Sequence, residues 1–284
     1  MIQYDPDNWR SHLFDVRGSM LREIVGRVTT TTLWAVLVVL FHEFIRPIDI
    51  PLTTHSLIGV VLGLLLVFRT NSSYDRFWEG RKLWGGIVNE CRNLARSAQV
   101  HLANDPPLRD TVIAWTALWP EAAKHLLQGR ISNPGPQPPL PDEDVSSALS
   151  APHAPLEVGR RITACLASAR DQGTISEYAL FQIDHNVQLL IDYIGGCERI
   201  HRTPIPYAYM VHLRRALIVY CGTLPIALVG EYHWLAIPAT LLVSYLFFGI
   251  EEIGVEIEDP FGDDANDLPL DKFCEKIAAD VRGL

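Results

Sequence analysis

Residues 56–68 read SLIGVVLGLLLVF, a run without Asp, Glu, Lys or Arg. The uncharged stretch extends back to Pro51 and so covers Pro51–Phe68. The chain has three more such stretches: Val28–Phe41, Ala216–Gly230 and Trp234–Ile250. The four stretches are 14 to 18 residues long. A helix that crosses a bilayer needs about 20 apolar residues. Each stretch alone therefore fits either a membrane-spanning helix or a buried helix of a soluble protein.

The order of the stretches favours a membrane protein. They come as two close pairs, as two helical hairpins would. The short connections within the pairs, HEFIRPIDI from His42 and EYH from Glu231, hold a single basic residue, Arg46. Basic residues gather instead at the opposite ends of the stretches, at Arg17, Arg22, Arg27, Arg69, Arg76, Arg81, Lys82, Arg199, Arg202, Arg214 and Arg215. By the positive-inside rule, we expect a multi-pass protein of the inner membrane with both termini in the cytoplasm.

Composition and motifs exclude several classes of protein. The chain has 284 residues, and its net charge of −9 argues against a nucleic-acid surface. Its five cysteines form no CxxC pair, so neither a zinc site nor a disulfide framework is indicated. His42 and Glu43 lack the second histidine of an HExxH motif, and no GxSxG or Walker-type loop occurs. We therefore expect no enzyme activity.

The polar region between the two pairs is expected to be cytosolic and helical. Helical periodicity covers Gly85–Leu102, Val112–Leu127 and Arg160–Tyr193. Residues 129–155 hold seven of the 19 prolines and predict an exposed, non-helical connection. The fold class is all-α. The expected divisions are a cytosolic N-terminal segment (1–27), the first transmembrane pair (28–70), the cytosolic helical region (71–205), the second transmembrane pair (206–250) and an acidic cytosolic C-terminal segment (251–284).

The second apolar stretch has the pattern of a pore lining. Val60, Leu64 and Phe68 repeat every four residues and so share one helix face. Gly59 and Gly63 lie on an adjacent face and predict a close approach of a neighbouring helix. A ring of such helices would place three apolar layers at its axis, where a constriction can block ions by losing its water. Ordinary helix packing in lipid is the alternative.

Four segments in this order resemble the bestrophins, specifically their bacterial branch. They are FDVRGSMLREIVGRV (14–28), LGLLLVFRTNSSYDRFWEGRKLWG (62–85), the run beginning GGCERIHRTPIP at Gly195, and EDPFGDDANDLPLD (258–271). The resemblance implies a pentameric ion channel with four transmembrane helices per subunit, a large helical cytosolic region and a central pore. Its implied partners are the lipid bilayer, further copies of the chain and permeant monovalent ions, with no nucleic acid.

The resemblance also implies the residues along the pore. The apolar neck falls on Val60, Leu64 and Phe68. A second constriction, the cytosolic aperture, falls on Tyr178 with Glu177 beside it, by ungapped extension from the GGCER block. Tyrosine departs from the family's usual small aliphatic residue and would form a narrower ring that can offer hydrogen bonds. The alternative is a tyrosine packed between cytosolic helices.

The acidic segment resembles the calcium-holding segment of animal bestrophins. The key carboxylate positions fall on Asp264 and Asp267, and carboxylates are ligands that calcium prefers. Ala265 and Asn266 interrupt the acidic run. Helix capping and salt bridges are the alternative role. The chain is therefore expected to require no cofactor, with calcium as the candidate ligand of these two residues.

The expected function is conduction of small monovalent ions through the neck and the aperture. Five copies of a chain with net charge −9, with Glu177 near the aperture, favour cations such as sodium. A chloride or other anion channel is the alternative within this class. A non-conducting membrane scaffold is the alternative from another class.

Overall fold

The computed structural model describes residues 18–130 and 137–283. Within these ranges every regular element is a helix and no strand occurs, which confirms the all-α prediction. The chain divides into two compact units. The first unit comprises Met1–Phe77, Pro204–Asp259 and Asp264–Asn266, and the second comprises Trp78–Thr203, Pro260–Asp263 and Asp267–Leu284.

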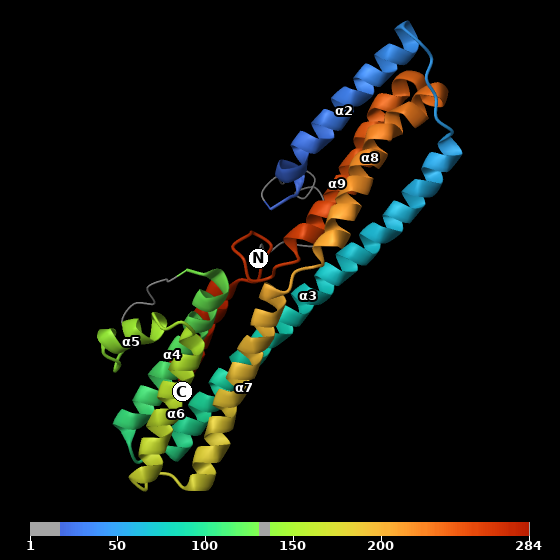
Figure 1. Ribbon diagram of the computed structural model, residues 1–284. Helices are drawn as coiled ribbons and strands as arrows, with labels where there is room; N and C mark the ends of the chain where they lie inside the picture. Colours follow the sequence, from blue (N-terminus) through green and yellow to red (C-terminus); the bar gives the residue numbers. More distant parts are fainter. Residues whose placement is uncertain (1–17, 131–136, 284) are drawn as a thin grey trace. The chain divides into compact units, whose positions relative to one another are not determined.

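The first unit holds the apolar helices. They are α2 (Leu21–Phe44), the first half of α3 (Leu52–His101), α8 (Tyr207–Tyr232), the short 3-10 helix η1 (His233–Leu235) and α9 (Ala236–Glu256). The four uncharged stretches lie inside these helices, apart from Pro51, which directly precedes α3. Among the described residues, three helical segments are long and apolar enough to cross a membrane: α2, α3 and Tyr207–Glu256. The last of these contains α8, η1 and α9, and Figure 1 shows α8 and α9 side by side, joined at η1.

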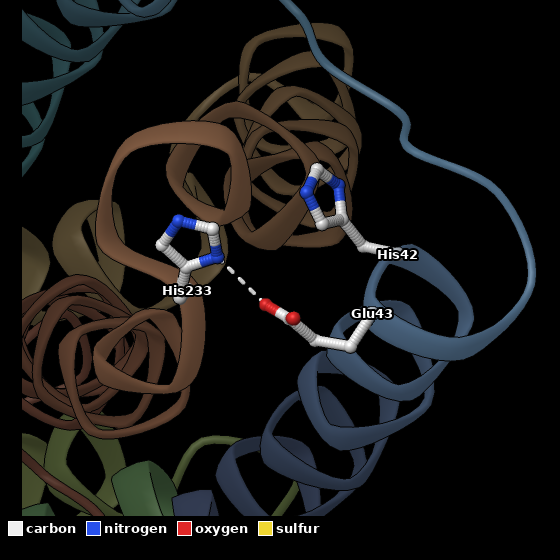
Figure 2. A group of neighbouring side chains, drawn as sticks. All are labelled: His42, Glu43 and His233. Carbon is white, nitrogen blue, oxygen red and sulfur yellow. Dashed lines mark hydrogen bonds and ion pairs between the residues drawn. The ribbon is translucent and has the colours of Figure 1, made fainter.

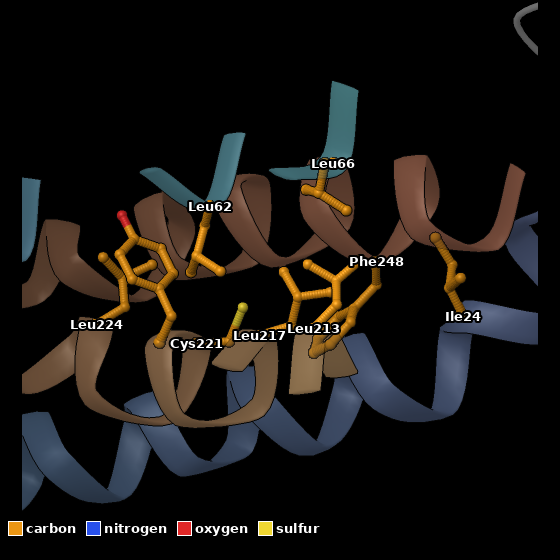
Figure 3. Packing of buried hydrophobic residues seen from close by; sticks show 9 residues of the cluster. Ile24, Leu62, Leu66, Leu213, Leu217, Cys221, Leu224 and Phe248 are labelled. Carbon is orange, nitrogen blue, oxygen red and sulfur yellow. The ribbon is translucent and has the colours of Figure 1, made fainter. Parts of the chain in front are cut away.

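One apolar cluster joins the four helices of the first unit (Figure 3). Leu62 and Leu66 of α3 are both buried. They pack with a set of residues from the other three helices: Ile24 of α2, Leu213, Leu217, Tyr220, Cys221 and Leu224 of α8, and Phe248 of α9. Leu62 and Leu66 are four positions apart, so they share one face of α3. That face is the inner face of the helix in this unit.

A glycine admits a side chain of α8 into this seam. A Cβ atom at Gly59 would lie 2.5 Å from the hydroxyl oxygen of Tyr220, so any larger residue would displace the tyrosine. Gly63 has no such neighbour, because a Cβ atom there would meet no atom within 4 Å. Of the two glycines expected to admit a neighbour, Gly59 alone therefore does so in the part of the chain that the structure describes.

Acidic residues in the last turns of α9 bind arginines from two other helices. Arg27 of α2 lies 2.6 Å from Glu252, measured between the guanidinium nitrogen and a carboxylate oxygen. Arg214 of α8 lies 2.8 Å from Glu251, whose side chain is buried. These pairs fasten one end of α2 and α8 to the same end of α9.

A fully buried arginine fastens α3 in a similar way. Arg69 donates to Glu258, just beyond α9, at 2.6 Å and to Ser73 at 3.0 Å. The other carboxylate oxygen of Glu258 accepts from the backbone N–H of Ile205 at 2.8 Å. The backbone carbonyl oxygen of Glu258 accepts from the side chain of Arg76 at 3.0 Å. Glu258 thereby joins α3 to the segment that leads into α8, and it is the ion-pair partner of a guanidinium that water does not reach.

The second unit contains the polar helices. They are the second half of α3, α4 (Pro106–Gln128), α5 (Asp142–Leu149), α6 (Ala154–Asp171), α7 (Glu177–Arg202) and α10 (Leu270–Arg282). Helix α4 packs against α6 and α10, and α6 packs against α7. The helices expected over Gly85–Leu102 and Val112–Leu127 are confirmed as parts of α3, which ends one residue earlier at His101, and of α4.

The expectation of a non-helical connection over residues 129–155 is wrong for part of that range. Helix α5 lies inside it, and α6 begins at its end. Pro141 precedes α5, and three acidic residues, Asp142, Glu143 and Asp144, fill the first turn. Negative charge at the amino end of a helix stabilises it against the helix dipole, which compensates for the many nearby prolines.

The continuous helix expected over Arg160–Tyr193 is broken into α6 and α7. Gly173 has a φ of 74°, a left-handed conformation that glycine adopts without steric cost. Ser176 then begins α7, because its side-chain oxygen accepts from the backbone N–H of Ala179 at 3.1 Å.

A buried lysine links α4 to α10. Lys124 lies 2.7 Å from Glu121 and 2.9 Å from Asp271, measured between its ammonium nitrogen and a carboxylate oxygen. Burial opposes the charge of Lys124, but the hydrogen bonds that the ammonium group donates to these two carboxylates outweigh it and raise the pKa of Lys124. Lys124 therefore stays charged at neutral pH.

We predict that Glu258→Gln destabilises the protein by about 3 kcal/mol, because it leaves the buried Arg69 charge without its ionic partner. The apparent melting temperature in detergent should fall by about 6 °C or more. Glu252→Gln is the matched control, since its partner Arg27 is half-exposed and such pairs contribute at most about 1 kcal/mol. Equal melting temperatures for the two variants would show that Arg69 does not depend on Glu258.

Candidate ion pathway

The three predicted neck residues lie on one exposed face of α3. Val60 is 71% exposed, and Leu64 and Phe68 are each 56% exposed. At 100° per residue, side chains two positions apart point about 200° away from each other. Because Leu62 and Leu66 are buried, the neck residues Val60, Leu64 and Phe68 point away from the core. Among the described residues, nothing covers this face of α3, which we call the neck face.

The neck face would line a short length of pore. At a rise of 1.5 Å per residue, the stretch from Val60 to Phe68 covers roughly 12 Å along the helix. Large apolar side chains at this exposure are unfavourable in water, so lipid, another copy of the chain or a narrow dewetted pore must face them. Neighbouring apolar residues of α3 are exposed as well, among them Leu57, Val61 and Val67.

Helix α3 continues without a break beyond the neck. The polar run that follows Phe68 is therefore helical. The arginines within this run have partners: Arg69 binds Glu258, Arg76 binds the carbonyl oxygen of that residue, and Arg81 lies over the ring of Phe273 at 5.1 Å. These contacts give the three arginines structural roles within their own units.

The two predicted aperture residues open helix α7. Ser176 is the capping residue, and Glu177 and Tyr178 follow in the first turn. Glu177 is an acidic residue at the amino end of a helix, which the helix dipole favours. The side chain of Tyr178 is 77% exposed, and nearby Phe181 is also exposed. Among the described residues, no helix of the same chain covers Tyr178, so the alternative of packing between cytosolic helices now requires a helix of another subunit.

The acidic segment after α9 has clear structural contacts. Asn266 donates to the carbonyl oxygen of Gly18 at 3.0 Å and to the carboxylate of Glu256 at 2.9 Å. Asp264 is exposed and Asp267 is buried. Neither belongs to a group of three His, Cys, Asp or Glu ligands in the described part of the chain. Calcium binding by Asp264 and Asp267 stays a prediction.

One cluster of potential metal ligands was not predicted from the sequence. His42 and Glu43, in the last turn of α2, meet His233 at the turn between α8 and α9 (Figure 2). The signal was present in the two short connections, since each begins or ends with a histidine and holds a glutamate. Their proximity could not be inferred from spacing, because 190 residues separate Glu43 from His233.

The comparisons with known proteins agree along the whole chain. The family described as bacterial/fungal bestrophin protein matches residues 1–283. A voltage-dependent anion channel-forming protein from Nostoc sp. is 39% identical over 281 residues, which covers 98% of this chain and 92% of that protein. A protein of the same description from Synechocystis sp. is 37% identical over 283 residues, with the same coverage.

A solved structure supports the fold. The crystal structure of a bacterial bestrophin homologue from Klebsiella pneumoniae is 28% identical in sequence and superposes with a TM-score of 0.85. The match covers 92% of this chain and 97% of the homologue. From the family match and these relatives, we conclude that the chain belongs to the bacterial and fungal bestrophins, a family of membrane ion channels and not of enzymes.

Proposed function

We propose that this chain assembles into a pentameric channel that conducts small monovalent ions through a neck formed by Val60, Leu64 and Phe68. The observation that carries the proposal is the exposure of these three large apolar side chains on the face of α3 that points away from the core. A ring of five such faces would bury the exposed surface around a narrow axis. An apolar ring of this kind resists ion passage because the ions must shed water to enter it.

The proposal includes four membrane-spanning helices per subunit. These are α2, the apolar part of α3, α8 and α9. Helices α8 and α9 form a hairpin because the chain turns at His233, where φ is 48°. The Arg27 and Arg214 side chains bind acidic residues at the end of α9, opposite to that turn. The positive-inside rule then places these arginine-bearing ends, and both termini, in the cytoplasm of a bacterial inner membrane.

For selectivity, we propose anions such as chloride. Two relatives of 37% and 39% identity are named anion channel-forming proteins, which supports the alternative over the sodium preference drawn from net charge. The net charge is a sum over the whole chain and does not give the local field, since several carboxylates, among them Glu251, Glu252 and Glu258, are paired with arginines. The ring edges of Phe68 also carry positive partial charge, which favours anions at the neck.

The function is tested by electrical recording from purified protein in a planar bilayer with unequal NaCl concentrations on its two sides. We expect a reversal potential with the sign of the chloride gradient. A reversal potential of the opposite sign would make the channel a cation channel, as the sequence alone favoured. The absence of current from a well-folded pentamer would support the scaffold alternative. The proposed conduction needs no cofactor, and recordings with and without calcium would show whether the acidic segment has a role.

We predict that Leu64→Ala raises ion flux. Alanine leaves room for a continuous file of water at the middle layer of the neck, so the dewetting barrier falls. A barrier lower by about 1.4 kcal/mol gives about tenfold more flux. Leu242→Ala on α9 is the matched control, because Leu242 has the same 56% exposure and is expected to face lipid. Similar flux through both variants, in liposomes of equal protein content, would place Leu64 away from the axis.

We predict that Tyr178→Ala admits larger ions and leaves the pentamer intact. Removal of five phenol rings widens the aperture, while the exposed side chain contributes little to packing within the subunit. Relative permeabilities for a graded series of anions measure the effect. Tyr207→Ala is the control, since Tyr207 has the same 77% exposure and lies at the start of α8. Identical permeability series for wild type and Tyr178→Ala would refute the aperture assignment.

A further inference from the structure

The cluster of His42, Glu43 and His233 has no part in the proposed conduction. Each of the three side chains offers one ligand atom, and these atoms all lie within 4.8 Å of one another. In the described part of the chain, this is the one group of three or more His, Cys, Asp or Glu side chains that meets such a limit. Figure 2 shows the two imidazoles and the carboxylate converging from the end of α2 and from the turn after α8.

The carboxylate and one imidazole are already in contact. Glu43 Oε1 lies 2.7 Å from His233 Nδ1. The rings of His42 and His233 lie nearly edge to face, with centroids 6.0 Å apart and an interplanar angle of 77°. Tetrahedral bonds of about 2.0–2.1 Å place neighbouring ligand atoms about 3.3 Å apart. Small side-chain rotations would therefore bring the ligand atoms to this spacing. Glu43 and His233 are exposed, so an ion can reach them from solvent.

His42 is held in an orientation that suits a ligand. Its Nδ1 lies 2.8 Å from the carbonyl oxygen of Ile48 and 3.1 Å from the N–H of the same residue. With the proton on Nδ1, the ring donates to the carbonyl and leaves the Nε2 lone pair free. Histidines that bind metals commonly donate their second nitrogen to a backbone carbonyl, which fixes the tautomer and the ring orientation. A metal at Nε2 would select this tautomer.

The donor set identifies the class of ion. Two imidazole nitrogens and one carboxylate oxygen suit zinc and related divalent transition metals, whereas calcium and magnesium prefer sites built from oxygen. Three protein ligands leave a fourth position for water. From this geometry we propose that His42, Glu43 and His233 form a zinc-binding site that links the end of α2 to the turn between α8 and α9.

The site would act as a clamp on the first unit. Its ligands come from two segments far apart in the sequence. A bound ion therefore cross-links these segments in the folded protein, whereas the unfolded chain does not hold the three ligands together. Metal that binds the folded state preferentially raises its stability in proportion to the logarithm of the metal concentration. This clamp goes beyond the proposed channel function and does not require that any ion be conducted.

Calorimetric titration of ZnCl2 into chelator-treated protein in detergent tests the proposal, together with melting curves. We expect one zinc per chain and a rise of the melting temperature with zinc but not with calcium. The variant His42→Gln with His233→Asn should bind zinc at least about 100-fold more weakly, since loss of groups that only support a ligand costs up to about that factor. Asparagine tolerates the positive φ at position 233.

His185→Gln is the control, because His185 is an exposed histidine of α7 in the second unit. It should bind zinc as wild type does. Cobalt in place of zinc gives a second readout, since bound four-coordinate cobalt absorbs strongly in the visible range. Equal melting temperatures of all three proteins in chelator would show that the variants fold. Zinc affinity and cobalt spectra that are the same in the double variant and in wild type would overturn the proposal.

Discussion

The apolar seam between α3 and α8 is the constraint on which the rest of the first unit depends. Leu62 and Leu66 are buried against Leu213, Leu217 and their neighbours, and Gly59 gives Tyr220 the room to join them. This contact fixes the rotation of α3 about its own axis. The residues that would line a pore are thereby selected by packing on the opposite face, because a helix cannot bury both faces in one seam.

The ion pairs at the ends of the apolar helices both hold the helices together and reduce the local charge. Arg27, Arg69 and Arg214 come from three helices, and all find carboxylates in the last turns of α9 or just beyond it. Each pair holds a helix in place and cancels a negative charge. The field that an ion meets is therefore set by the residues that remain exposed along its path, and the net charge of the chain is a poor guide to selectivity.

The four apolar helices could be predicted from the sequence, because uncharged stretches and helical periodicity report on single elements. Single residues that begin or end a helix against the general character of their segment were harder to predict. Helix α5 forms in a Pro-rich region because Asp142 and its acidic neighbours favour its first turn, and Gly173 ends a pattern that looked continuous. The cluster at His42 was missed because its members meet only when the chain folds. Tyr178 lies in the same helix as the GGCER block, so the ungapped extension along the sequence is sound, and its role at an aperture stays a prediction.

Cysteine accessibility would test most directly whether the exposed face of α3 lines the ion pathway. Leu64→Cys and Leu62→Cys differ by two positions on one helix, and wild type serves as the background because four of its five cysteines are buried and Cys165 is half-buried. A small charged thiol reagent should block the current through Leu64→Cys within seconds to minutes and leave Leu62→Cys and wild type unchanged. Block of Leu62→Cys with no effect on Leu64→Cys would contradict the assignment of Val60, Leu64 and Phe68 to the pore.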